Sequence, residues 1–287
     1  MLPNFNDIRY FLEVSQTLNI SRASERLGIT QPSLSLAVQR LETALGSKLL
    51  VRTKGGVQLT PQGQKFTNHA RGLLQDWESI RSEALNLQTE VTGQYTIGCH
   101  PSVAMYTLPF FLPKLLEKHP GLQVSLKHDL SRKITEDVIS FKLDFGIVVN
   151  PVQHPDLVIQ KLLSDEVTFW TSNQPSKNQD LNSDQAVLIA DPELLQSQTL
   201  MKKAEKQGLK FARSIGSSNL EVITSLVASK AGIAILPQRV ATRVKTYKLK
   251  KVETKMVFAD SICLVYRADM QKTEAAKTII KEIRSLN

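Results

Sequence analysis

Apolar residues recur with helical spacing in three short segments near the N-terminus. The spacing predicts one helix over about residues 6–17, a second with Ser21 as its N-cap and Gly28 at its end, and a third capped by Thr30. The third helix has an apolar stripe with intervals of four, three and four residues, formed by Leu34, Val38, Leu41 and Leu45. The three helices are expected to enclose a small core.

The opposite face of the third helix is mostly polar. A rotation of 100° per residue places five side chains on that face, with Ser35 at its margin: Pro32, Leu36, Gln39, Arg40 and Thr43. A helix that buries one stripe and presents such side chains outward can enter the major groove of DNA. From periodicity alone, an ordinary surface helix with a hydrated outer face is the alternative.

The segment after Gly46 predicts two short strands joined by a turn at residues 54–56. Arg52 and Lys54 would lie at the tip of this hairpin, where they could contact phosphate groups or enter a minor groove. A hydrated hairpin tip is the alternative interpretation.

A long helix is predicted to begin after Thr60, which serves as its cap before Pro61. Its apolar positions alternate at intervals of four and three residues, which is the repeat of a coiled-coil seam. A long helix with one apolar stripe needs a partner helix, which predicts a homodimer, whereas packing on its own domain is the alternative. The seam consists of Phe66, Ala70, Leu73, Trp77, Ile80, Ala84, Leu87 and Val91.

From Gly93 onward, strand-like and helix-like segments alternate, which predicts an α/β domain with mostly parallel sheets. The predicted strands are 94–99, 122–128, 145–149, 167–171, 186–190, 211–215, 233–236 and 261–267. The predicted helices are 106–119, 131–141, 193–207, 218–229 and 273–286.

Ligands of such sheets bind beyond the carboxyl ends of strands, near helix N-termini. Three loops meet this description: His100–Ser102, Asn150–Pro151 and Gly216–Asn219. The hydroxyl of Ser102 could hold a carboxylate there. The basic run at residues 239–255 could favour an anionic effector or attract DNA, but a hydrated surface is the preferred interpretation.

Length and composition restrict the class of protein. A chain of 287 residues suggests two or three domains, and it contains neither a membrane-spanning apolar run nor a signal-peptide pattern near its start. The two cysteines, Cys99 and Cys263, both lie in strand-like runs, which favours a cytoplasmic protein with reduced thiols. The net charge of +9 is weak evidence for DNA binding, because residues 1–90 contribute only +2 of it.

Motifs of catalysis are missing from the sequence. It has no GxSxG, GxGxxG, phosphate-loop, CxxC or HExxH pattern. His100 and Ser102, two residues apart, have no orienting acid in view, and Cys99 with His100 would need a distant group to complete a metal site. We therefore expect no enzyme, no metal and no cofactor beyond a small-molecule effector. The rival interpretation is a cytoplasmic small-molecule binding protein or enzyme whose N-terminal helices serve only in assembly.

Residues 4–60 resemble the winged helix-turn-helix of LysR-type transcriptional regulators. The resemblance rests on FLEV at 11–14, SRASERLGITQPSLS at 21–35, RLE at 40–42, LG at 45–46, Arg52 and LTPQG at 59–63. Leu36 and Leu50 depart from the family pattern, which often has a polar residue and an aromatic residue there. The runs DFGIVV and LVASKAGIAILP extend a weaker resemblance to the family's effector domain.

The resemblance implies an α+β multi-domain fold: a winged helix-turn-helix at 1–60, a linker helix at 61–91, and a periplasmic-binding-protein-like effector domain of two lobes at 92–287. Lobe 1 would comprise about residues 92–162 and 267–287, and lobe 2 residues 163–266. It further implies a homodimer or homotetramer that binds double-stranded DNA, no membrane partner, and RNA polymerase as a candidate further partner.

The resemblance also assigns residues to the two sites. DNA contacts are expected from Arg22, Thr30, Gln31, Pro32, Ser33, Ser35, Leu36, Gln39, Arg40, Arg52 and Lys54. Effector contacts are expected between the lobes from His100, Pro101, Ser102, Ser131, Asn150 and Asn219.

Overall fold

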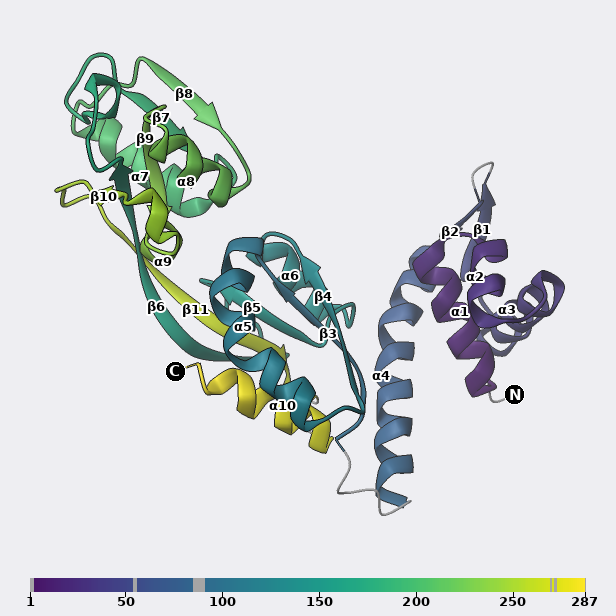
Figure 1. The fold of residues 1–287 in the computed structure, drawn as a ribbon. Helices are drawn as coiled ribbons and strands as arrows, with labels where there is room; N and C mark the ends of the chain where they lie inside the picture. The colour runs from purple at the N-terminus through teal and green to yellow at the C-terminus, as the bar shows by residue number, and fades with distance from the viewer. Residues whose placement is uncertain (1–2, 54–55, 85–90, 269, 271–272, 287) are drawn as a thin grey trace. The chain divides into compact units, whose positions relative to one another are not determined.

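The computed structural model describes residues 3–53, 56–84, 91–268, 270 and 273–286. The chain forms two compact units. The first comprises residues 1–90 with residues 140–142, and the second comprises the rest of the chain. Figure 1 labels the helices and strands of both units.

The first unit has the three predicted helices, the hairpin and the long helix. In chain order these are α1 (Phe5–Thr17), α2 (Ile20–Leu27), α3 (Gln31–Leu45), β1 (Leu50–Thr53), β2 (Gly56–Leu59) and α4 (Pro61–Ala84). Gly28 and Gly46 end α2 and α3 in the left-handed conformation, with φ of 65° and 62°. Thr30 caps α3 as predicted, because its hydroxyl accepts the backbone N–H of Ser33.

The start of α2 differs from the prediction. Asn19 rather than Ser21 is the N-cap, and its side chain accepts the backbone N–H of Arg22 at 3.0 Å. Ser21 instead lies inside the helix, and its hydroxyl donates to Gln31 at 3.4 Å. Both residue types cap helices well, so only the observed backbone distinguishes them.

The core of the first unit contains the predicted apolar stripe except for its last member. Leu34, Val38 and Leu41 are buried, whereas Leu45 is 39% exposed. Leu45 is the last residue of α3, one turn beyond Leu41, so the prediction that it is buried was wrong.

The second unit is an α/β structure built on one continuous sheet. Its described strands are β3 (Gly93–Cys99), β4 (Leu122–His128), β5 (Phe145–Val149), β6 (Leu157–Thr171), β7 (Val187–Ala190), β8 (Arg213–Gly216), β9 (Ile233–Pro237), β10 (Lys250–Lys251) and β11 (Phe258–Arg267). The strand order is β4-β3-β5-β11-β6-β9-β7-β8, with β10 paired to β6. The sheet is mixed rather than mostly parallel, because β11 is antiparallel to both β5 and β6, and β6 to β9.

Helices cover both faces of this sheet. They are α5 (Pro101–Lys118), α6 (Ser131–Ile139), α7 (Leu195–Lys206), α8 (Leu220–Ala228), α9 (Gln238–Ala241) and α10 (Glu274–Arg284). In lobe 1, α5 and α10 pack into one core and α6 into another. In lobe 2, α7 and α8 contribute to two separate cores.

Two long strands connect the lobes. Strands β6 and β11 lie side by side and run from one lobe to the other (Figure 1). The predicted strand at 167–171 is only the end of β6, which begins at Leu157. Ile262 and Tyr266 lie in the lobe 1 core with Leu162, whereas Phe258 packs in lobe 2. The part of β11 from Ile262 onward therefore packs in the lobe 1 core, whereas the predicted lobe boundary lies near Arg267.

Candidate DNA-reading surface and inter-lobe site

The outward face of α3 is exposed within the first unit. Leu36 is 57% exposed, although it is an apolar side chain on a helix whose opposite stripe is buried. The other predicted DNA-contact residues are also accessible, Ser35 only partly: Arg22, Thr30, Gln31, Pro32, Ser33, Gln39, Arg40 and Arg52. Lys54 lies outside the described residues.

Arg40 takes part in an ion pair within the unit. Its guanidinium donates two hydrogen bonds to the buried carboxylate of Asp7 on α1, at 3.0 and 2.6 Å. These hydrogen bonds raise the pKa of Arg40. A guanidinium held by both oxygens of one carboxylate is fixed in direction, so Arg40 ties α3 to α1.

Glu42 connects α3 to the hairpin. Its carboxylate accepts the backbone N–H groups of Leu49 and Leu50 at 2.9 and 3.2 Å, and its other oxygen pairs with Lys48 at 2.7 Å. Burial raises the pKa of Glu42, but the hydrogen bonds from Lys48, Leu49 and Leu50 outweigh it and lower that pKa overall. The RLE motif thus fixes α3 on both sides.

A close approach of backbones explains the glycine of the LTPQG motif. A Cβ at Gly63 would lie 2.0 Å from the backbone oxygen of Leu49. The hydroxyl of Thr60 also accepts the N–H of Gly63 and donates to the backbone oxygen of Lys48. The motif therefore fixes the start of α4 against the hairpin.

The seam of α4 divides into two parts. Ala70 is buried in the core of its own unit, and Phe66 packs there with its ring centroid 5.4 Å from that of Phe11. These two residues therefore pack in the core of their own unit, and their part in a dimer interface stays a prediction. Farther along, Leu73, Trp77 and Ile80 are 46%, 45% and 57% exposed. Leu87 and the side chain of Ala84 lie outside the part that the structure describes.

Side chains from both lobes meet at the N-terminus of α5. Ser102 of lobe 1 is buried and donates its hydroxyl to Glu221 of lobe 2 at 3.3 Å. His100 caps α5, since its Nδ1 accepts the N–H of Ser102 at 3.3 Å. Burial lowers the pKa of His100, while the negative charges of Asp191 and Glu221 raise it by a smaller amount.

A second polar cluster lies where the crossover strands pass between the lobes. Asp260 on β11 accepts hydrogen bonds from Asn150 of lobe 1 at 2.7 Å and from Gln196 of lobe 2 at 3.0 and 3.1 Å. Asp165 on β6 lies directly opposite Asp260. Burial raises the pKa of Asp260 to about 6 and also raises that of Asp165.

The remaining predicted effector residues have local structural tasks. Ser131 accepts the N–H of Val149 at 2.9 Å, and Asn219 caps α8 by accepting the N–H of Val222 at 3.0 Å. Pro101 is the first residue of α5. The structure thus brings Ser102 into contact with lobe 2 and Asn150 into contact with β11, and places His100 within the electrostatic influence of lobe 2, whereas Ser131 and Asn219 act within their own lobes.

Sequence reasoning missed the acidic members of these clusters. Asp191 directly follows β7, so the rule about carboxyl ends of strands points to it as well as to the chosen loops. Glu221 lies in the first turn of α8, two residues after Asn219. Asp260 gave no local signal, because its partners Asn150 and Gln196 are distant in sequence.

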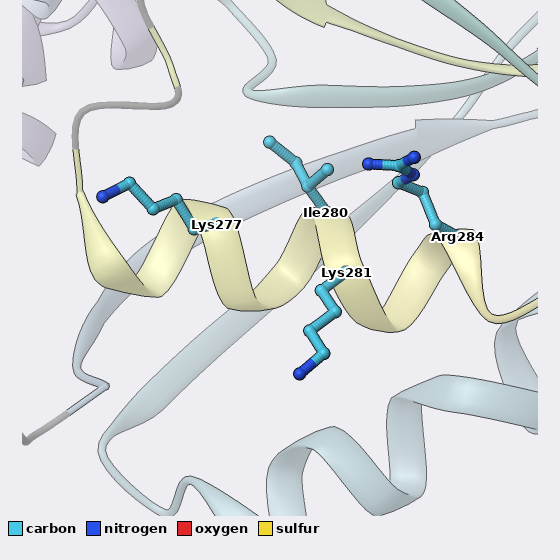
Figure 2. Close-up of a pocket in the computed structure, with 4 residues that line it drawn as sticks. All are labelled: Lys277, Ile280, Lys281 and Arg284. Atoms are coloured by element: carbon cyan, nitrogen blue, oxygen red, sulfur yellow. The ribbon is translucent and has the colours of Figure 1, made fainter.

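Two surface hollows lie elsewhere in the second unit. Figure 2 shows one, of about 240 Å³, lined by Lys277, Ile280, Lys281 and Arg284 of α10. The other, of about 780 Å³, lies beside the end of β6 and β10 in lobe 2. Neither hollow contains a residue predicted to bind the effector.

The described residues show neither a metal-binding cluster nor a membrane-spanning helix. That part of the chain holds no group of three His, Cys, Asp or Glu side chains placed to bind a metal ion. Nor does any helix found there have both the length and the apolar character needed to cross a bilayer.

Comparison with known protein families matches almost the whole chain. Residues 5–64 match the model "Bacterial regulatory helix-turn-helix protein, lysR family", and residues 88–286 match "LysR substrate binding domain".

The chain is also similar to individual proteins. It is 26% identical to a "Hydrogen peroxide-inducible genes activator" of Haemophilus influenzae over 82% of this chain and 80% of that protein. Its fold is similar to a full-length OxyR variant from Pseudomonas aeruginosa, with a TM-score of 0.76, 22% identity and coverage of 99% and 95%. It is also similar to full-length CbnR complexed with its target DNA, with a TM-score of 0.61, 20% identity and coverage of 99% and 100%.

Proposed function

Because the chain belongs to the LysR family of DNA-binding transcriptional regulators, we propose that it reads its operator with α3 and responds to a small molecule held between the two lobes. Regulators rather than enzymes make up this family, which sets the enzymatic interpretation aside. The observation that carries the DNA-reading proposal is the exposed face of α3, supported from behind by its buried stripe.

The residues of this face divide into two roles. The N-terminus of α3 and its surroundings would hold phosphates through backbone N–H groups, hydroxyls and the cation of Arg22. Ser35, Leu36 and Gln39 would face base edges. Arg40 would position α3 rather than read a base, because Asp7 already engages its guanidinium. Arg52 on the hairpin would add a phosphate or minor-groove contact.

The exposed part of the α4 stripe supports a homodimer. Leu73, Trp77 and Ile80 present three large apolar side chains on one helix face, and another copy of α4 would cover them. Two copies of α3 would then address two half-sites of a partly palindromic operator. A tetramer and contact with RNA polymerase remain predictions from the family resemblance.

The inter-lobe clusters support an effector site. His100 and Ser102 of lobe 1 lie near Glu221 and Asp191 of lobe 2, and β6 and β11 connect the lobes. A ligand bound to groups of both lobes would favour one arrangement of the lobes over others. That change would alter the spacing of the DNA-reading helices and the bend of the DNA.

One relative is named for its response to hydrogen peroxide, but the two thiols of this chain are poorly suited to react with peroxide. Cys99 and Cys263 are buried, and burial raises the pKa of Cys99 to about 12. Peroxide oxidises thiolates, and a buried thiol at this pKa stays protonated. Strand β5 also lies between the two cysteines, which puts their Cα atoms on the order of 10 Å apart, too far for a disulfide.

A gel-shift assay with DNA from upstream of the protein's own gene tests the proposal. We expect sequence-selective retardation that weakens as salt rises, because phosphate contacts release counterions. Treatment with hydrogen peroxide should leave the retardation unchanged, and so should the double change Cys99→Ser with Cys263→Ser. Absence of retardation at low salt would contradict the DNA-reading role.

A further inference from the structure

The inter-lobe site is acidic in a basic protein. The chain carries a net charge of +9, yet Asp191 and Glu221 of lobe 2 act together on His100 of lobe 1. His100 brings no positive charge, because its Nδ1 accepts the N–H of Ser102, which leaves its proton on Nε2. The local balance of charge at this site is therefore negative.

One carboxylate oxygen in the site lacks a partner. Asp191 is fully buried, and its Oδ1 accepts the N–H of Glu193 at 2.9 Å. Its Oδ2 is buried as well, and no described residue donates a hydrogen bond to it. A buried carboxylate oxygen without a donor is costly, so a bound molecule that supplies a donor to it would be stabilised.

The contacts around Ser102 argue against an anionic ligand. Its hydroxyl donates to Glu221 and is therefore directed to a negative group of the protein. A carboxylate ligand would have to displace Glu221 and then lie beside it and Asp191. The like charges would oppose such binding.

A metal ion fits the site less well than an organic cation. Among the residues that the structure describes, no three potential ligands are grouped closely enough to hold a metal. An ammonium or guanidinium group needs only hydrogen-bond acceptors around it, and two carboxylates from different elements provide them.

Building on the proposed effector function, we propose that the inter-lobe site binds a small organic cation whose ammonium or guanidinium group lies between Asp191 and Glu221. The cation would donate to the free oxygen of Asp191. Because Glu221 also accepts the hydroxyl of Ser102, a cation bound to Glu221 would connect lobe 2 to Ser102 and His100 of lobe 1.

Thermal unfolding of the full-length protein with defined probes tests this inference. L-Arginine, putrescine and methylguanidine at about 10 mM should raise the melting temperature of the wild-type protein above that in equimolar potassium chloride. The single changes Asp191→Asn and Glu221→Gln should each weaken binding at least tenfold in calorimetric titration. The matched change Asp184→Asn, at an exposed carboxylate of lobe 2, should leave binding unchanged.

Several results would overturn the proposed binding of an organic cation. The inference would be overturned if none of the three amines raised the melting temperature of the wild-type protein. It would also be overturned if the amines raised the melting temperatures of Asp191→Asn and Glu221→Gln as much as that of the wild type. Stabilisation by succinate, or by magnesium or manganese chloride, that depends on the inter-lobe residues would overturn the cationic class but leave the effector function standing. Loss of the proposed function itself would show separately, as absence of DNA retardation.

Discussion

At the scale of single residues, neighbours decide what a side chain can do. Leu36 and Arg40 lie on the same outward face of α3, and the sequence assigned both to base contact. The structure leaves Leu36 57% exposed and pairs Arg40 with a buried aspartate. An apolar side chain held outward on a DNA-reading helix suits the methyl group of thymine.

The change Leu36→Ala should weaken operator binding by roughly 1 kcal/mol, or about fivefold in Kd, because one apolar base contact is lost. Fluorescence anisotropy with labelled operator DNA measures the loss. Leu45→Ala is the matched control, because Leu45 lies nine residues farther on and therefore on the opposite side of the helix. The same loss on DNA with uracil in place of thymine would rule out the methyl contact.

Asp260 should make stability depend on pH. Its pKa rises from 3.8 to about 6 in the folded protein, so the folded state binds the proton more tightly than the unfolded chain. The group therefore favours folding at low pH, and this contribution is lost as pH rises through about 6. Asp260→Asn should increase the free energy of unfolding at pH 7.5 by on the order of 1–2 kcal/mol relative to wild type, and less at pH 5.

Urea unfolding of both proteins at the two pH values measures this difference. Asp184→Asn, which removes an exposed carboxylate, serves as the control and should follow the wild-type profile. An equal effect of Asp260→Asn at pH 5 and pH 7.5 would contradict the assigned cause.

At the scale of elements, the two parts of α4 differ in burial. The first turns of α4 complete the core of the DNA-reading unit through Phe66 and Ala70. Its later turns present Leu73, Trp77 and Ile80 outward, with Trp77 also stacked near Phe5 at 4.9 Å between ring centroids. The heptad pattern alone cannot separate these roles, since both require apolar residues at the same spacing.

The double change Trp77→Lys with Ile80→Lys should convert the dimer to monomers in sedimentation velocity, because it places charges on the apolar contact. Gln64→Lys with His69→Lys adds the same charge at exposed positions of α4 and should keep the dimer. A variant with both seam changes that remained dimeric would show that α4 does not form the interface.

At the scale of the whole molecule, the local charge of each region differs from what the net charge of the chain suggests. Residues 18–60 carry a local net charge of +4, which suits a surface that meets phosphates. Residues 91–287 carry a net charge of +7, yet the inter-lobe site within them is acidic. A net charge therefore predicts neither the DNA-reading surface nor the class of ligand, because binding depends on the few groups within contact distance.

The sequence by itself determined the elements of this protein and the family to which it belongs. Periodicity, caps and glycines predicted the bounds of α1 and α3 and the start of α4 to within a residue or two, and placed the hairpin after Gly46, because these features act over a few neighbouring positions. Exceptions include Ser21 and Leu45, the start of β6, which pairing with β11 extends, and the start of α5, which lies at Pro101 instead of Tyr106.

The tertiary structure alone decided which groups meet. Three hydrogen-bonded pairs are distant in sequence. Arg40 and Asp7 are separated by 33 residues, Ser102 and Glu221 by 119 residues, and Asn150 and Asp260 by 110 residues. No local pattern encodes such pairs, because folding brings them together through packing of the elements that carry them. The chemistry of the inter-lobe site, and with it the expected class of effector, follows from those long-range contacts.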